Sequence, residues 1–387
     1  MKNLVKLFYP LFFLVSIILP RNKNIWIFGN VDGYLDNTRY FFEFASMQNK
    51  YVCIWLANNK EELKSIKQIG LNTVLKNSIK GYWHSARAYM TFICTGFSDV
   101  NRVLSLKSKV INFWHGTPIK KVYLDSQHDL SRFGTTKLAI FISTMLMKYL
   151  ISRISFYYAS NKLEQELVCS SAKMNITKSL AIGTPRLDQI KLMASNKIKD
   201  TIDSNKKIIL YAPTWREGGS WSNKFNLSNV DYSDLNNFLY KENALLLVKP
   251  HPLTLQKEIE SWGLISSENI KFVSEFNIND INVLYTISDM LITDISSSMF
   301  DYLIFKKPII LFMPDKDDYI NGSRGIYDYF IDTLNLYSIG NWNDLIKKLM
   351  DKTLKIPLLN KIANDFQNIQ SVNLAIYEDI INRFGRV

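Results

Sequence analysis

The sequence alternates short apolar runs with polar, amphipathic stretches along nearly its whole length. Residues 25–28, 51–56 and 92–95 are the first apolar runs, and stretches of helical character at 39–48 and 61–69 lie between them. Alternating strands and helices are typical of a parallel sheet covered by helices. The pattern therefore predicts an α/β fold, in which ligands bind outside the carboxyl ends of the strands.

A chain of 387 residues is too long for one simple core, so two domains are expected. The polar segment 196–207 is rich in Lys, Asp, Asn and Ser, and it is the best candidate for the boundary. We therefore predict one Rossmann-like domain at 21–195 and a second at 207–387. The second α/β series begins with apolar strands at 207–212, 244–248 and 290–292.

The first residues form a hydrophobic segment that is too short to cross a membrane. Lys6 and Pro10 interrupt it, and the remaining run 11–19 falls short of the roughly 20 residues that a spanning helix needs. No small-residue cleavage site precedes Pro20, which argues against a cleaved signal peptide. We expect residues 1–20 to lie on a membrane surface, and the alternative is an N-terminal helix packed on the protein.

The formal net charge of +12 indicates a polyanionic partner, which could be nucleic acid, an anionic membrane or a phosphate-rich substrate. Nucleic acid is not favoured, because no long run of consecutive Lys and Arg occurs. Residues 137–156 combine apolar residues at helical spacing with Lys and Arg, which predicts a basic amphipathic helix at a membrane interface. A plain core helix is the alternative. The three cysteines are far apart without a CxxC spacing, so neither a zinc site nor a disulfide scaffold is indicated.

Residues 114–121, Trp-His-Gly-Thr-Pro-Ile-Lys-Lys, follow a predicted strand and carry the first candidate for chemistry. Thr117 and Pro118 are the residue types of a helix N-cap and a first helical position, so a helix is predicted to begin there. His115 would then lie beside a helix N-terminus, which favours an anion. The same turn supplies close backbone approach and a cation, from Gly116 and Lys120. Phosphate chemistry is one interpretation, and an ordinary strand–helix corner is the other.

The second half of the chain places polar side chains after three predicted strands. Ser296 or Ser297 would cap a helix at 299–305, whose N-terminus could hold a phosphate. Asp301, in its first turn, could accept a hydrogen bond from a ribose or glycerol hydroxyl. The other two strand ends supply Pro213, Thr214 and Arg216, and then Lys249 and His251. Each feature alone has an ordinary structural explanation, but their common position at strand ends favours one ligand site.

Several familiar catalytic fingerprints do not occur in the sequence. It contains no HExxH, no GxxxxGK[ST], no GxGxxG and no GxSxG, so zinc hydrolases, P-loop enzymes, dinucleotide-binding enzymes and serine hydrolases are not indicated. The remaining histidines, His84 and His128, have no partner in the sequence pattern and are interpreted as structural or exposed.

The order of these motifs resembles the CDP-glycerol glycerophosphotransferases of teichoic acid synthesis. The motifs that carry the resemblance are HGTPIK at 115–120, GTPRLD at 183–188, YAPTWR at 211–216, KPHP at 249–252 and TDISSSMFD at 293–301, with further segments at 29–37 and 324–328. The resemblance implies a GT-B architecture, with two Rossmann-like domains facing across a cleft and the nucleotide held mainly by the C-terminal one. It also implies a peripheral or monotopic protein on the cytoplasmic face of the bacterial membrane. Thr184 and Ile295 stand where the family more often has aromatic residues.

The resemblance also implies a mechanism, in which a hydroxyl of an undecaprenyl-linked acceptor attacks the β-phosphorus of CDP-glycerol and CMP leaves. His115 is the expected general base, and His251 would stabilise the pyrophosphate or protonate the leaving phosphate. Arg186 and Arg216 would supply charge to the pyrophosphate. The predicted substrate-binding residues are Gly116, Thr117, Pro118, Lys120, Arg186, Pro213, Thr214, Arg216, Lys249, Ser296, Ser297 and Asp301. No cofactor is expected, and a need for a divalent metal stays open.

Two other functions stay open at this stage. One is a transferase on the same scaffold that uses CDP-ribitol or a nucleotide sugar for capsular polysaccharide. The other is a non-catalytic, membrane-associated binding module. The candidate histidines argue against that module, because a binding protein has little need for groups that titrate near neutrality. The sequence does not distinguish a primase from a polymerase, and it leaves the acceptor and the oligomeric state open.

Overall fold

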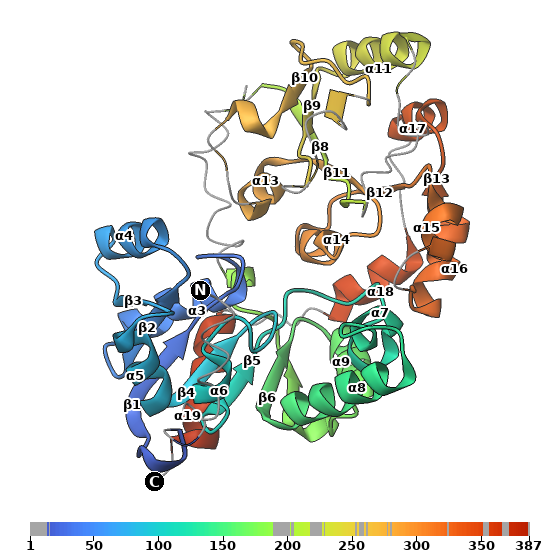
Figure 1. The fold of residues 1–387 in the computed structure, drawn as a ribbon. Coiled ribbons are helices and arrows are strands. Elements are labelled where there is room, and N and C mark those ends of the chain that lie inside the picture. Colours follow the sequence, from blue (N-terminus) through green and yellow to red (C-terminus); the bar gives the residue numbers. More distant parts are fainter. Residues whose placement is uncertain are drawn as a thin grey trace. The chain divides into compact units, whose positions relative to one another are not determined.

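The computed structural model describes residues 14, 16–188, 202, 205–216, 227, 229–251, 254, 259–260, 262–276, 278, 281–322, 325–350, 356–365 and 371–385. They form two compact units, each built around a parallel sheet (Figure 1). The predicted α/β class, with two Rossmann-like units, is confirmed. Unit 1 comprises Met1–Thr117, Val122–Gln189 and Phe366–Val387, and unit 2 comprises Pro118–Lys121 and Ile190–Asp365.

Unit 1 contains a seven-stranded sheet in the order β3-β2-β1-β4-β5-β6-β7. All neighbouring strands pair in parallel. The strands are β1 (Asn22–Phe28), β2 (Val52–Ala57), β3 (Thr73–Leu75), β4 (Ala88–Ile93), β5 (Lys109–Asn112), β6 (Ile154–Ala159) and β7 (Ser179–Ala181). The order of the strands reverses direction between β1 and β4, and in such sheets the carboxyl edge at this switch point is where ligands bind.

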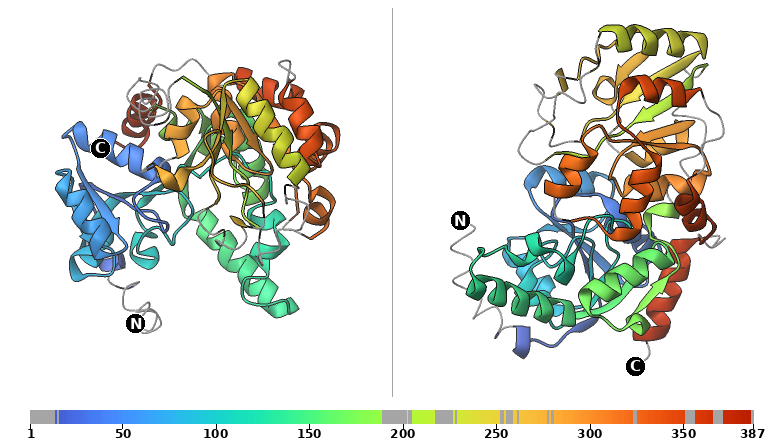
Figure 2. Two further views of the ribbon diagram at one scale, coloured as in Figure 1. Left: turned by 90° about the horizontal axis from the view of Figure 1, so that it is seen from above. Right: turned by 90° about the vertical axis from the view of Figure 1, so that its right-hand side faces the viewer.

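The helices of unit 1 begin where polar side chains accept backbone N–H groups. Asn59, Ser78 and Asn161 each accept from the N–H three residues further on, which satisfies donors that have no partner within the helix. The helices are α3 (Asp36–Met47), α4 (Lys60–Gln68), α5 (Ile79–Arg87), α6 (Arg102–Ser105), η1 (Tyr123–Asp125), α7 (Gln127–Leu130), α8 (Lys137–Ser152), α9 (Lys162–Ala172), η2 (Ile176–Lys178) and α19 (Val372–Phe384). Figure 2 shows helices flanking the strands of each sheet.

An aromatic ladder crosses the sheet of unit 1 and forms one side of its core. Phe28 of β1 stacks on its strand neighbour Phe92 of β4, with ring centroids 4.4 Å apart. Phe92 stacks in turn on Phe113, which follows β5. The apolar face of α19 completes the same cluster with Val372, Ile376, Tyr377 and Ile380. These rings fix the carboxyl ends of the three central strands in one layer.

The position of α19 corrects the predicted domain limits. Residues 207–387 were expected to form one domain, but Phe366–Val387 belongs to unit 1. The physical reason is that Asp188 accepts the first backbone N–H groups of α19, those of Val372 and Asn373, at 2.7 Å each. The predicted domain at 21–195 is also wrong at 118–121, which lies in unit 2. The predicted linker 196–207 lies largely outside the described residues.

Unit 2 contains a six-stranded sheet in the order β10-β9-β8-β11-β12-β13, also parallel throughout. Tyr211, Phe312 and Trp342 pack together in its core. The strands are β8 (Lys207–Tyr211), β9 (Ala244–Val248), β10 (Ile270–Phe272), β11 (Met290–Thr293), β12 (Ile309–Phe312) and β13 (Ser338–Ile339). The helices are α11 (Asn229–Lys241), η6 (Val273–Glu275), α13 (Ile281–Ile287), α14 (Ser298–Tyr302), η7 (Leu303–Phe305), α15 (Lys316–Gly322), α16 (Asp328–Tyr337), α17 (Trp342–Leu349) and α18 (Pro357–Asp365).

The helix predicted at 137–156 is present as α8, but it ends at Ser152 because the chain enters strand β6 at Ile154. Many of its large apolar side chains face solvent, namely those of Leu138, Phe141, Ile142, Met145 and Tyr149. Most of the segment 1–20 lies outside the described residues, although Leu14, Ile17 and Ile18 are exposed. None of the helices that the structure describes combines the length and apolar character needed to span a bilayer.

Replacement of Ile376 by Ala should lower the free energy of unfolding of unit 1 by about 2–5 kcal/mol, because it removes a fully buried side chain from the core. Leu374→Ala, on an exposed face of the same helix, is the matched control and should change that free energy by no more than about 0.5 kcal/mol. Urea unfolding followed by tryptophan fluorescence measures both. Equal effects of the two variants would show that α19 does not pack as described.

Candidate functional site

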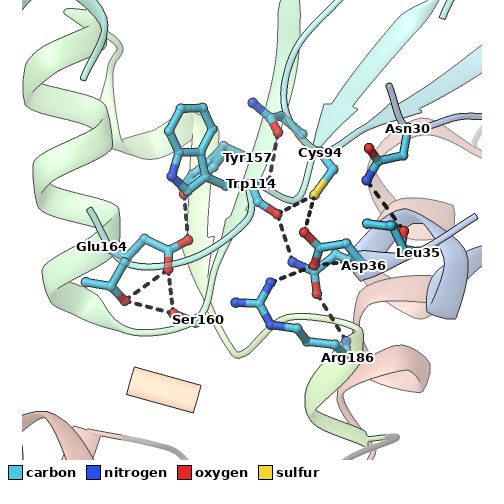
Figure 3. A network of polar contacts seen from close by, with 12 residues as sticks. Asn30, Leu35, Asp36, Cys94, Trp114, Tyr157, Ser160, Glu164 and Arg186 are labelled. Atoms are coloured by element: carbon cyan, nitrogen blue, oxygen red, sulfur yellow. Dashed lines mark hydrogen bonds and ion pairs between the residues drawn. The ribbon is translucent and has the colours of Figure 1, made fainter. Parts of the chain in front are cut away.

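Loops from four strand ends meet at the carboxyl edge of the sheet of unit 1 (Figure 3). Asp36 and Asn37 begin α3 after β1, Cys94 follows β4, Trp114 follows β5, and Arg186 follows β7. Arg186 Nη1 lies 2.7 Å from Asp36 Oδ1, and the Arg186 backbone N–H donates to Asn37 Oδ1. Side chains from distant parts of the sequence are therefore joined at the switch point of the sheet.

The backbone of Trp114 is held in a conformation that non-glycine residues rarely adopt. Its φ angle is 55°, in the left-handed region. Its carbonyl oxygen accepts hydrogen bonds from Asn37 Nδ2 and Cys94 Sγ, both at 2.8 Å. Its N–H donates to Asn112 Oδ1 at 2.8 Å. Such strain persists only where neighbouring groups enforce it, and it is frequent at functional sites.

His115 lies at the surface directly after this strained residue. Its ring stacks on that of Trp114, with centroids 4.4 Å apart. Displacement of water by the surrounding protein lowers the pKa of His115, while the Asp36 carboxylate opposes that effect. A lowered pKa favours the neutral form of the ring, which is the form that can accept a proton.

The expected helix at Thr117–Pro118 does not form, and this prediction is wrong. Thr117 does not cap a helix, because its hydroxyl donates to Glu164 Oε2 and accepts from Asn161 Nδ2. Residues 118–121 belong to unit 2, where Lys120 forms an antiparallel bridge with Ile326. Gly116, directly before Thr117, has a φ of 138°, a conformation that favours glycine.

Glu164 is a buried carboxylic acid that sequence reasoning missed. It is fully inaccessible to solvent, and its oxygens accept from the hydroxyls of Tyr157 at 2.6 Å and Ser160 at 2.5 Å (Figure 3). Burial raises the pKa of Glu164, although these hydroxyls partly offset the effect. A Glu in the first turn of α9 looks like an ordinary helix-start residue in sequence, so no signal pointed to its role in fixing Thr117.

In unit 2, Arg216 forms a buried ion-pair cluster. Its guanidinium binds Asp315 in a bidentate manner at 2.7 and 2.9 Å, and Nη1 lies 2.8 Å from Asp294. Burial by itself lowers the pKa of Arg216, but the two carboxylates outweigh it and raise that pKa. The hydroxyl of Thr214 also donates to Asp294, at 2.6 Å. Sequence reasoning missed both carboxylates, although Asp294 stands inside the motif at 293–301; the role of Arg216 as a pyrophosphate ligand stays a prediction.

Lys120, predicted with the motif of His115, lies among the candidate residues of unit 2. Its Nζ is 5.1 Å from the ring centroid of Tyr319, and the guanidinium of Arg216 is 4.5 Å from the same ring. Displacement of water by neighbouring atoms, together with the positive charges of Lys249 and Lys120, lowers the pKa of His251. A cluster of positive charge with a histidine at its border suits a phosphate group.

The serine-rich turn after β11 differs from the prediction in one respect. Ser297 is the N-cap residue of α14, but its side chain makes no capping hydrogen bond, and the helix of 298–302 continues as a 3-10 turn to Phe305. Ser296, Ser297 and Asp301 are half-buried, and Pro213 is buried beside Tyr211. Arg324 and Pro252 lie outside the described residues. The roles of these residues in binding stay predictions.

Comparison with known proteins assigns the chain to a family. The family model described as CDP-glycerol:poly(glycerophosphate) glycerophosphotransferase matches residues 11–361. A teichoic acid poly(glycerol phosphate) polymerase of Bacillus spizizenii is 31% identical over 352 residues, which are 84% of this chain and 83% of that protein. A teichoic acid glycerol-phosphate transferase of Staphylococcus aureus is 30% identical over 325 residues, which are 80% and 79% of the two chains. A Staphylococcus epidermidis polymerase is matched over only 46% of its length.

Solved structures agree with this assignment. The wall teichoic acid polymerase TagF superposes with a TM-score of 0.72 at 25% identity, covering 99% of this chain and 96% of that chain. The UDP-GlcNAc 2-epimerase of Neisseria meningitidis has a TM-score of 0.57 at 11% identity, over 93% of this chain and 100% of that chain. The latter likeness concerns the fold alone.

The raised pKa of Glu164 gives a pH dependence of stability. Because folding favours its protonated form, the stabilising contribution is present below its ordinary pKa of 4.5 and is lost as the pH rises through the higher folded value. Glu164→Gln cannot ionise, so its unfolding free energy should rise relative to wild type between pH 4.5 and 7.5. Urea unfolding at both pH values measures this difference, with the exposed Glu61→Gln as the control. A difference that is constant with pH would contradict the prediction.

Proposed function

The chain belongs to the CDP-glycerol:poly(glycerophosphate) glycerophosphotransferase family, and on this premise we propose that it builds teichoic acid. It transfers glycerol phosphate from CDP-glycerol to a lipid-linked acceptor and releases CMP. The observation that carries the proposal is the family match over residues 11–361, within which His115 follows the strained, hydrogen-bonded Trp114 at the carboxyl edge of the sheet. The relatives that support the substrate class are polymerases and transferases of glycerol phosphate.

In the proposed reaction, His115 removes the proton from the acceptor hydroxyl as its oxygen attacks the β-phosphorus of the donor. A new oxygen–phosphorus bond forms, and the bond from the β-phosphorus to the bridging oxygen breaks, so that CMP departs with that oxygen. Positive charge near the phosphates stabilises the transition state. We assign Lys120, Lys249 and His251 to this role, because they are neighbours in unit 2 and the two lysines lower the pKa of His251.

Purified protein should release CMP from CDP-glycerol in the presence of a lipid-linked acceptor, and less from CDP-ribitol or UDP-sugars. His115→Ala should lower turnover by roughly 10²–10⁴, because the general base is lost. His128→Ala is the matched control, since this exposed histidine contacts only Asp129 among the hydrogen bonds described. Preference for CDP-ribitol would redirect the donor assignment; a teichoic acid ribitol-phosphate polymerase of Staphylococcus aureus matches 38% of this chain. Near-normal turnover of a folded His115→Ala protein would remove it from the role.

We further propose that the protein binds the membrane surface through α8. This helix exposes a band of apolar side chains, with Leu138 at 68%, Phe141 at 61% and Met145 at 53% exposure. Lys137 begins the helix and Lys148 lies in its second half, while the whole chain carries a net charge of +12. Apolar insertion combined with positive charge favours a bilayer that contains anionic lipids. An acceptor on a lipid would then be presented to the enzyme at the bilayer, on its cytoplasmic face.

The double variant Phe141→Glu with Met145→Glu should bind anionic liposomes more weakly than wild type, because two charges replace inserted side chains. Flotation on a density gradient measures the bound fraction, and a protein lacking residues 1–20 reports the share of the N-terminal segment. Tyr240→Glu, at a 76% exposed position on α11, is the control and should float like wild type. If neither the full-length nor the truncated protein floats, the membrane proposal is wrong.

A further inference from the structure

Asp36 differs from an ordinary helix-start residue in its backbone conformation and in the number of contacts that its carboxylate makes. Its φ angle is 62°, in the left-handed region, although it is the first residue of α3. Its Oδ1 accepts from Arg186 Nη1 at 2.7 Å and from the Asn37 backbone N–H at 2.8 Å, and its Oδ2 accepts from Cys94 Sγ at 3.3 Å. The backbone strain and these contacts together place one carboxylate in a fixed position among the loops of the site.

Cys94 links this carboxylate to His115. The Cys94 thiol shares its single hydrogen between the Asp36 carboxylate and the carbonyl oxygen of Trp114, the residue whose ring stacks on that of His115. Asp36 is therefore connected through Cys94 to the residue that directly precedes His115. The charges of Asp36 and His115 act on each other in both directions: the carboxylate raises the pKa of His115, and His115 lowers the pKa of Asp36.

The positive charge of Arg186 opposes the effect of the Asp36 carboxylate on the pKa of His115. The guanidinium is 5% exposed and ion-paired with the carboxylate, and its positive charge lowers the pKa of His115. Burial by itself raises the pKa of Asp36, but Arg186 and His115 outweigh it, so the pKa of Asp36 is lowered and the group is ionised. The ring of His115 thus experiences an anion and a cation whose separation is fixed by a buried ion pair.

Asp99 also acts on the pKa of His115, but its carboxylate is engaged in hydrogen bonds with the backbone of nearby loops. Asp99, from the loop after β4, raises the pKa of His115 to a smaller extent. Its carboxylate accepts the backbone N–H groups of Val31, Cys94, Thr95 and Gly96, as well as the Thr95 hydroxyl. Replacement of Asp99 would disturb the loop itself, so its charge cannot be varied cleanly.

We propose that Asp36 and Arg186 are positioning residues, whose buried ion pair, tied through Cys94 to the carbonyl oxygen of Trp114, holds an anion and a cation in fixed positions beside the loop that carries His115. The inference rests on the proposed role of His115 as general base. The carboxylate stabilises the imidazolium that forms as the acceptor hydroxyl loses its proton. The guanidinium limits this effect, so that the ring is still neutral when the reaction starts.

The inference predicts opposite shifts in two variants. Asp36→Asn removes the anion and should lower the titration midpoint of His115, whereas Arg186→Gln removes the cation and should raise it, each by on the order of one pH unit. Asn tolerates the left-handed conformation, so the first variant keeps the backbone of Asp36. Arg186→Lys keeps the charge and should restore a midpoint close to that of wild type.

Nuclear magnetic resonance titration of protein labelled at histidine measures the midpoint without an activity assay. The chain has only four histidines, and His115→Asn identifies the signal of interest. Asp188→Asn is the matched control, because Asp188 caps α19 and should leave the midpoint of His115 unchanged. Unmoved midpoints in both Asp36→Asn and Arg186→Gln, or shifts in the same direction, would overturn the inference.

Kinetics separate this inference from the proposed function. The acid limb of the kcat/KM profile with CDP-glycerol should move down in Asp36→Asn and up in Arg186→Gln, following the titration midpoints. Shifted midpoints with an unshifted acid limb would support the charge coupling and overturn His115 as the base. Absence of any CMP release by wild-type protein would overturn the proposed function alone, because the titration still reports the ion pair.

Discussion

The carbonyl oxygen of Trp114 accepts two hydrogen bonds, and the arrangement of unit 1 around its candidate site depends on them. Its donors come from the start of α3 and the end of β4, while the acceptor follows β5. Three strand-end loops that lie far apart in sequence are thereby tied to one atom. The left-handed φ of Trp114 would not persist without such partners, because an aromatic residue in this region is strained.

Further hydrogen bonds connect the Trp114 region to two other parts of unit 1, the loop of Arg186 and the helix that contains Glu164. Toward Arg186, the side-chain amide of Asn37 bridges the Trp114 carbonyl and the Arg186 backbone, so a fourth loop is fixed by the same residue. Toward Thr117, the buried acid Glu164 binds the hydroxyl of Thr117 and anchors the far end of the turn. His115 thus stands between two anchored residues, which restrict its backbone. A rigid support of this kind reduces the reorganisation needed when the ring accepts a proton.

The strands could be predicted from sequence because the buried parts of parallel strands are apolar, as in all of β9 and in the last four residues of β1. The same logic located His115 and Arg186 at strand ends. It failed at Thr117, where local residue types favour a helix start but the hydroxyl binds Glu164 in a distant helix. It also failed for α19, whose contact with Asp188 joins residues 184 positions apart in the chain. Ion pairs such as that of Arg216 with Asp315 are equally non-local, and no spacing in a single sequence reveals them.

The four residues of 118–121 carry an evolutionary consequence. Unit 2 is not encoded by one continuous stretch, because this segment, inserted in the sequence of unit 1, supplies an antiparallel bridge to Ile326 and hydrogen bonds to Gly325 and Tyr329. Unit 1 in turn is completed by α19, which follows unit 2 in the chain. Recombination between relatives at a single junction therefore separates residues that fold together. Lineages of this family are expected to diverge by coordinated substitution in both halves of the gene rather than by exchange of one half.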